Sequence, residues 1–191
     1  MARHKEFDSD QALDNAMQVF WKKGFQATSI QDLVEATGVN RASLYGTFGG
    51  KHELFQKALG RFQNADEQDF YQITKQCRPG LDRIRSAFRH IARQTLSDPR
   101  GCLVVNAVAE GADLDPTLAR AGKASRQKIE QFFHACLKQA VKAGEIPAAR
   151  DIRALARFLT NTLFGLRMMA KMKPDPKLVD DVIATALSAI N

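Results

Sequence analysis

A cluster of hydrogen-bonding side chains occupies a short stretch of this 191-residue chain. Arg41, Ser43, Tyr45 and Thr47 are expected on the polar face of a short predicted helix. An arginine suits bidentate contact with guanine, and a serine hydroxyl can donate or accept a hydrogen bond. All four side chains are polar and of hydrogen-bonding type.

Three predicted helices position these side chains, over residues 8–24, 29–38 and 40–49. Their expected caps are Asp8 with Gln11, Ser29 with Asp32, and Asn40, and their expected buried residues are Leu13, Ala16, Met17, Phe20, Ile30, Leu33, Val34, Leu44 and Phe48. Only three residues, one of them a glycine, separate the second helix from the third. Two short helices so joined, braced by a longer one, are typical of a helix-turn-helix.

Residues 8–55 resemble the DNA-binding domain of the TetR/AcrR family of transcriptional regulators. The matching positions are Gly24-Phe25, Thr28-Ser29, Leu44-Tyr45, Phe48 and Lys51-x-x-Leu54. The Phe-Gly-Gly-Lys run that starts at Phe48 departs from the commoner aromatic-basic sequence of the family at this place. The spacing of several positions, rather than one short motif, carries the resemblance.

The resemblance implies that the third helix lies in the DNA major groove, whose edges distinguish all four base pairs. The implied DNA-binding residues are Thr28, Ser29, Arg41, Ser43, Tyr45, Thr47 and Lys51, of which Thr28, Ser29, Tyr45, Thr47 and Lys51 match phosphate-contacting positions. Arg3 and Lys5 precede the domain and could form an arm in the minor groove. Alternative interpretations remain: Tyr45 as a half-buried core aromatic, Arg41 as a solvated charge, Lys51 as a surface residue of a first helical turn, and the arm as plain disorder.

The net charge of +7 suggests a polyanionic partner but does not locate it. Residues 1–60 carry seven basic and seven acidic side chains, so the whole excess of 21 basic over 14 acidic lies in residues 61–191. Non-specific DNA affinity comes from neutralised phosphates. The absence of a net charge in residues 1–60 therefore counts against a sequence-independent architectural protein.

Several classes of protein are not expected from this sequence. It has no apolar run long enough to span a membrane, and its first residues lack the apolar core of a signal peptide, so we expect a cytoplasmic protein. The spacing of the cysteines and histidines predicts neither a disulfide framework nor a metal site, and we expect no cofactor. There is no nucleophile elbow, phosphate-binding glycine loop or Glu-x-x-His pair, so we do not expect an enzyme.

Helical periodicity continues to the end of the chain and predicts an all-α fold of about nine helices. The further expected helices cover residues 51–76, 81–97, 102–110, 116–143, 151–171 and 177–190. We expect a DNA-binding domain over residues 1–50. A helical ligand-binding and dimerisation domain is expected over residues 51–191.

The predicted helix over residues 151–171 has two apolar stripes. They consist of Ile152, Leu155, Leu159, Leu163 and Leu166, and of Phe158, Gly165, Met168 and Met172. A two-sided apolar helix in a soluble protein needs either a thick core or a twin subunit, and this argument together with the resemblance favours the twin. Members of the family dimerise through their last two helices, and we expect a homodimer through residues 151–190.

The resemblance also implies a small-molecule effector, bound in the C-terminal domain. Apolar and amide side chains from suitable helices are candidates for its pocket: Phe62, Phe88, Ile91, Leu103, Asn106, Phe132 and Leu163. Most of them are equally explained as core. Arg85, Arg89 and Arg93 recur every four residues and are expected to form a solvated stripe rather than an anion-binding wall.

Cys102 is a candidate redox- or electrophile-sensing thiol. It follows Arg100-Gly101 at the start of a predicted helix, where the helix dipole and a neighbouring cation favour the thiolate. The alternative interpretation is an inert buried cysteine.

Together these features predict a dimeric transcriptional regulator, most simply a repressor released from a palindromic operator by a small molecule. The competing hypotheses are an architectural DNA-binding protein, a helical enzyme, and an interaction module that has lost DNA binding.

Overall fold

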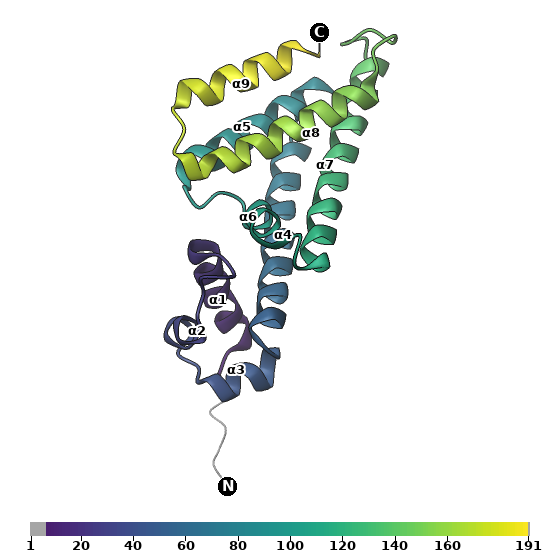
Figure 1. Cartoon of the computed structure of the whole chain (residues 1–191). Helices are drawn as coiled ribbons and strands as arrows, with labels where there is room; N and C mark the ends of the chain where they lie inside the picture. Colours follow the sequence, from purple (N-terminus) through teal and green to yellow (C-terminus); the bar gives the residue numbers. More distant parts are fainter. Residues whose placement is uncertain (1–6, 191) are drawn as a thin grey trace. The chain divides into compact units, whose positions relative to one another are not determined.

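The helices of the protein begin and end close to the residues that the local sequence indicates. A computed structural model describes residues 7–190. Its elements are α1 (Ser9–Lys23), α2 (Ile30–Thr37), α3 (Arg41–Phe48), α4 (Lys51–Lys75), α5 (Leu81–Ser97), α6 (Leu103–Gly111), α7 (Pro116–Lys142), α8 (Ile152–Met169), the 3₁₀ turn η1 (Ala170–Met172) and α9 (Pro176–Ser188) (Figure 1). The predicted all-α class is confirmed, with nine α-helices within the described part of the chain.

Side-chain caps explain where the helices start. The Asp8 carboxylate accepts hydrogen bonds from the backbone N–H groups of Asp10 and Gln11, at 2.9 and 3.1 Å. Ser29 and Asp32 cap α2 reciprocally, with each side chain accepting from the backbone N–H of the other at 3.0 and 2.9 Å. A cap of this kind stabilises a helix by about 1 kcal/mol.

Contacts between helices divide the chain into two compact units, one that ends at Ala65 and one that starts at Asp66. The long helix α4 contributes to both, because its segment 51–65 belongs to the first unit and the rest to the second. The domain boundary expected at residue 50 falls at the start of this helix.

The first unit is built around a small aromatic core. The ring centroids of Phe20 and Phe55 lie 5.0 Å apart, edge to face, and both side chains are fully buried. At the rim of this core, Arg61 on α4 forms ion pairs with Asp10 and Asp14 on α1, at 2.8 and 2.6 Å. These contacts brace α1 against the first part of α4.

The core of the second unit lies among α5, α7, α8 and α9. The rings of Phe88 and Phe133 stack with centroids 5.6 Å apart at its centre. The helix α9 packs on α5 and α8 and adds Val179 and Ala186 to the same core, and Ile190 joins them just after the helix ends (Figure 1). None of the helices within residues 7–190 is long and apolar enough to cross a bilayer.

The two apolar stripes expected on α8 separate as predicted. Leu159, Leu163 and Leu166 are buried in the core of their own chain. On the other stripe, Phe158 is 43% exposed and Gly165 is exposed. The helix itself is shorter than expected, because it ends at Met169 and continues as the 3₁₀ turn η1.

Candidate functional site

The short turn between α2 and α3 fixes how α3 leaves the first unit. Gly38 has φ +68°, a left-handed conformation that favours glycine. The Asn40 side chain then accepts a hydrogen bond from the backbone N–H of Ser43 at 2.9 Å and so starts α3. Leu44 and Phe48 are buried, which anchors one side of α3 and leaves the other side outward.

The outward side of α3 carries the predicted DNA-contacting residues Arg41, Ser43, Tyr45 and Thr47 on its two flanks. On one flank the guanidinium of Arg41 lies 5.2 Å from the centroid of the Tyr45 ring, within cation–π range. Arg41 is exposed and Tyr45 is half-buried. On the other flank Thr47 is exposed, and Ser43 is partly exposed.

Two outward positions of α3 were missed by the sequence interpretation. At 3.6 residues per turn, Ala42 and Gly46 lie opposite the buried Leu44 and Phe48, and both are exposed. A Cβ built on Gly46 would meet no heavy atom within 4 Å. A helical wheel of residues 41–48 could have found both positions, but small apolar residues give no chemical signal.

At the start of α2 the two predicted phosphate contacts differ in their surroundings. Ser29 is exposed at the N-cap, where helix N–H groups can donate hydrogen bonds to an anion. Thr28 is 1% exposed, and its hydroxyl donates to the backbone oxygen of Gly24 at 2.6 Å. We therefore correct the expectation for Thr28: its hydroxyl secures the turn before α2 instead of facing outward.

Lys51, the last of the predicted phosphate contacts, is partly buried at the start of α4. Its ammonium nitrogen lies 3.3 Å from the backbone oxygen of Gln26 and 4.6 Å from the centroid of the Phe25 ring. The side chain therefore braces the segment that leads into α2. The predicted arm residues Arg3 and Lys5 lie outside the described residues.

Acid is expected to weaken the α2 cap. Hydrogen bonds from Lys23 and from Ser29 lower the pKa of Asp32 from 3.8 to about 2. Because the folded-state pKa is depressed, this contribution to stability is complete above the unfolded value and is lost as the pH falls towards about 2. The free energy of unfolding, measured by urea titration at several pH values, should therefore be higher for the wild type than for Asp32→Asn at neutral pH. The two values should converge in acid. Glu35→Gln, on the same helix but outside the cap, controls for the loss of one negative charge.

The predicted effector-binding residues do not form one lining. Phe62 belongs to the first unit, where its ring packs edge to face on Trp21 with centroids 4.8 Å apart. The others belong to the second unit, where Phe88, Ile91 and Leu163 are fully buried core residues and Leu103 and Asn106 are buried on α6, while Phe132 is partly buried. Of the whole set, Phe132 lines a cavity between α4, α7 and α8.

A cavity of about 180 Å³ lies in the second unit between α4, α7 and α8. Its apolar lining consists of Phe70, Tyr71, Ile129 and Phe132, and its polar and charged lining consists of Asp66, Glu67, Thr74, Ser125, Lys128 and Arg167. Lys128 and Glu67 pair at 2.6 Å. A cavity of this composition suits a small, mostly apolar molecule with one polar group.

Arg167 is the most unusual residue of this cavity, because it is a buried cation. Its side chain is 6% exposed, and its guanidinium contacts Asp66 at 2.8 Å and the Cys102 sulfur at 3.3 Å. Although burial disfavours the cation, the electrostatic interactions with Cys102 and Asp66 raise the pKa of Arg167 above its usual value. A charged group thus joins the cavity to the predicted sensor thiol.

The sequence interpretation missed Arg167, although a signal was present. It is the one charged residue in the stretch 158–170. A lone cation in an apolar run is expected to have a buried partner. The partner Asp66 lies 101 residues earlier and could not be identified from spacing alone.

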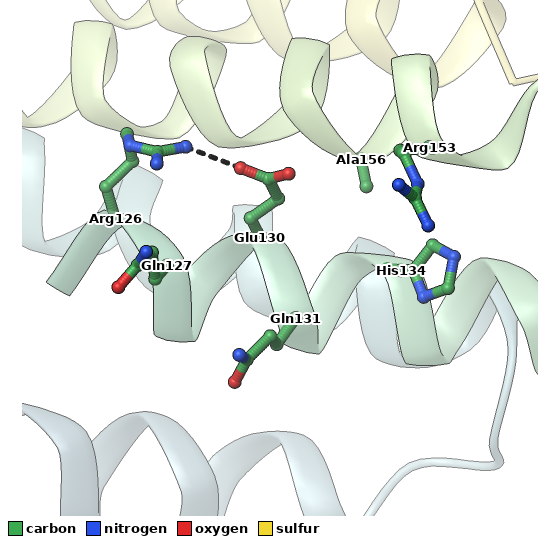
Figure 2. A pocket seen from close by; sticks show the side chains of 7 residues that line it. All are labelled: Arg126, Gln127, Glu130, Gln131, His134, Arg153 and Ala156. Atoms are coloured by element: carbon green, nitrogen blue, oxygen red, sulfur yellow. Dashed lines mark hydrogen bonds and ion pairs between the residues drawn. The ribbon is translucent and has the colours of Figure 1, made fainter. Parts of the chain in front are cut away.

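A second hollow, of about 310 Å³, lies between α7 and α8. Figure 2 shows Arg126 paired with Glu130 along α7, with His134 and Arg153 at the other end. Most of its lining is polar and exposed to solvent. The arginines expected on a solvated stripe, Arg85, Arg89 and Arg93, are exposed on α5, as predicted.

Comparison with known proteins gives matches to both units. The family described as "Bacterial regulatory proteins, tetR family" matches residues 12–58, and the family described as "Tetracyclin repressor-like, C-terminal domain" matches residues 80–186. The latter match covers more than half of the chain.

Full-length relatives agree with these matches. The uncharacterized HTH-type transcriptional regulator YezE of Bacillus subtilis (strain 168) is 32% identical over 198 residues, with 100% of both chains covered. The HTH-type transcriptional repressor ComR of Escherichia coli (strain K12) is 33% identical over 177 residues, which cover 88% of this chain and 82% of ComR. A cysteine variant of the TetR family regulator CifR, solved with 26-bp double-strand operator DNA, is 30% identical with a TM-score of 0.87, and 100% of both chains is covered. These relatives are regulators and not enzymes, and the chain belongs to the TetR family of DNA-binding transcriptional regulators.

Proposed function

We propose that the protein is a homodimeric repressor that binds a palindromic operator and leaves it when a small molecule binds the second unit. The observation that carries this proposal is the outward side of α3, a hydrogen-bonding surface held by a buried anchor and a capped turn. Relatives named as repressors, and the CifR structure with operator DNA, support it.

In this proposal α3 enters the major groove and its flanks read the bases. Arg41 contacts a guanine, Ser43 on the other flank hydrogen-bonds to a second base, and Ala42, between the flanks, can contact a thymine methyl group. Ser29, Tyr45, Thr47 and Lys51 are assigned to phosphates, which set the register of the helix on the duplex without specifying its sequence. Thr28 is not included because its hydroxyl is buried.

The dimer is proposed to form through residues 151–190. Phe158 on α8, Met172 in η1 and Leu178 on α9 are 43%, 73% and 45% exposed in the single chain. A two-fold axis beside these helices would bury each of them twice, once per subunit. The same axis would present two α3 helices to half-sites about 34–36 Å apart.

The effector is proposed to enter the cavity between α4, α7 and α8. A ligand there would contact Phe70, Phe132 and Arg167, and would bear on the part of α4 that starts the second unit. Since α4 continues into the first unit, a ligand that prefers a shifted α4 would favour dimers with misplaced α3 helices. The site of action would be the cytoplasm, where the operator is accessible.

A binding selection tests the proposed function. Purified protein is incubated with random double-stranded DNA, and the retained molecules are sequenced. We expect an enriched palindrome with half-sites about one helical turn apart. Arg41→Ala should weaken binding to that operator by about 1–3 kcal/mol and relax the preference at one base pair of each half-site.

Two other outcomes would contradict the proposal. Retention of DNA without any enriched sequence, lost at moderate salt, would favour an architectural protein. Absence of DNA binding would favour an interaction module. Gln31→Ala, an exposed change on α2 outside the proposed contacts, serves as the matched control for Arg41→Ala.

A further inference from the structure

The sulfur of Cys102 lies where the residues just before α6 pack closely against Arg167 on α8. We call this place the junction between α6 and α8. Gly101, directly before Cys102, has φ +69°, and a Cβ there would lie 3.1 Å from the backbone oxygen of Arg167. A larger residue would therefore push the loop away from α8. This close approach holds the Cys102 sulfur 3.3 Å from the terminal nitrogen of Arg167.

Two buried polar atoms at this junction have unused hydrogen-bonding capacity. Within residues 7–190, Nε of Arg167 and Oδ1 of Asn106 have no partner, while the two side chains are 6% and 7% exposed. An unpaired buried polar atom is unfavourable, because it has given up its hydrogen bonds with water. Such atoms are able to bind a partner from outside the chain, such as a ligand, a reacting group or an ordered water.

Arg167 connects this junction with the cavity. Its side chain lines the cavity, and its terminal nitrogen contacts the thiol. A molecule whose carbon skeleton lies on Phe70 and Phe132 would reach the guanidinium with its polar end. The guanidinium is a strong donor towards an oxygen that develops negative charge.

We propose that Cys102 is a nucleophile for small, uncharged α,β-unsaturated carbonyl compounds that enter the cavity, with Arg167 as the donor to their carbonyl oxygen. The inference rests on the proposed function, since it names the effector class of the same regulator. The sulfur forms a bond to the β-carbon, the C=C π pair moves to give an enolate, and the α-carbon takes up the proton that the thiol gives up. Nothing leaves, and no oxidant is needed.

The adduct would also disturb an ion pair. A carbon chain on the Cys102 sulfur occupies the space where Arg167 now contacts it, so the guanidinium must move. Arg167 holds Asp66 on α4. Alkylation would therefore release α4 from α8 within the second unit.

The other two cysteines provide internal controls. Cys136 is as buried as Cys102, 5% exposed in each case, but it lies in the apolar core, where burial raises its pKa to about 11. Cys77 is partly exposed, so it would react faster than the other two cysteines if solvent exposure alone set the rate of alkylation. One protein sample thus compares three thiols with different surroundings.

The test treats the full-length protein with methyl vinyl ketone and follows each cysteine by peptide mass spectrometry, with butan-2-one as the unreactive analogue. We expect Cys102 to be alkylated at least about tenfold faster than Cys77 or Cys136. Arg167→Gln should slow Cys102 alone by about tenfold or more, and Arg167→Lys, which keeps the cation, should restore part of the rate. Equal rates for the three cysteines, or a faster Cys77, would overturn the proposal without the need for any variant.

A DNA readout separates this inference from the proposed function. On the selected operator, alkylation should release the wild type and Cys136→Ser but not Cys102→Ser. A Cys102 adduct that leaves the operator bound would overturn the regulatory part of the inference. If no operator is found, the proposed function fails, and the alkylation rates still decide whether Cys102 is the nucleophile.

Discussion

Replacement of Arg167 by methionine is expected to destabilise the second unit by about 3–5 kcal/mol. The change removes one partner of a buried ion pair and leaves the Asp66 carboxylate, whose side chain is 16% exposed, without its cation. It also removes the donor to the Cys102 sulfur. Urea unfolding followed by circular dichroism measures the loss.

Two further variants identify the cause of this loss. Asp66→Leu combined with Arg167→Met replaces both charges by apolar groups and should recover most of the stability. Arg157→Met, on the same helix but 61% exposed, should change stability by less than about 0.5 kcal/mol. If Arg167→Met alone is as stable as the wild type, the ion pair between Arg167 and Asp66 is not formed in solution.

A charge at Phe158 is expected to abolish the dimer at micromolar concentration. Phe158→Asp places a carboxylate in the proposed interface twice, once from each subunit. At about 2 kcal/mol for each central apolar contact, the two copies together weaken association by about a thousandfold. Sedimentation velocity measures the change, and operator affinity should fall with it because one subunit contacts only one half-site.

The matched control is a second exposed apolar residue of the same unit. Leu114 is 78% exposed in the loop before α7 and lies outside residues 151–190. Leu114→Asp should leave both the sedimentation coefficient and operator binding unchanged. Dissociation by Leu114→Asp and not by Phe158→Asp would move the interface away from α8 and α9.

Local signals made most of the fold predictable. The caps at Ser29, Asn40 and Asp115 use hydrogen bonds between residues two or three positions apart. They can therefore be predicted from the local sequence alone. The apolar stripe that includes Leu159 and Leu163 repeats every three or four residues, and this spacing specifies a buried helix face. Both kinds of signal require no knowledge of the tertiary structure.

The cavity could not be predicted in the same way. Its Arg167–Asp66 pair joins residues 101 positions apart, and no periodicity relates them. Apolar residues on suitable helices were assigned to a pocket, yet Phe88 and Ile91 fill the core completely. Sequence patterns indicate which residues are buried, but they do not show where packing leaves a space.

The predictability of the proposed DNA-contacting residues was intermediate between that of the fold and that of the cavity. Position on the helix identified Arg41 and Thr47 as outward, and both are exposed. Thr28 was misjudged because a threonine before a helix N-cap is equally able to hydrogen-bond its own turn, here to the oxygen of Gly24. A polar residue type therefore does not by itself tell a ligand contact from a local one.

The small residues on the outward side of α3 bear on how much information an operator half-site can hold. Between the two flanks, Ala42 offers one methyl group and Gly46 offers only backbone. In the proposed complex, a base pair beneath these two residues would be contacted directly only through a thymine methyl group. The aligned sequences of genuine operators should accordingly show two well-defined positions in each half-site, separated by a tolerant one where substitutions accumulate without loss of control.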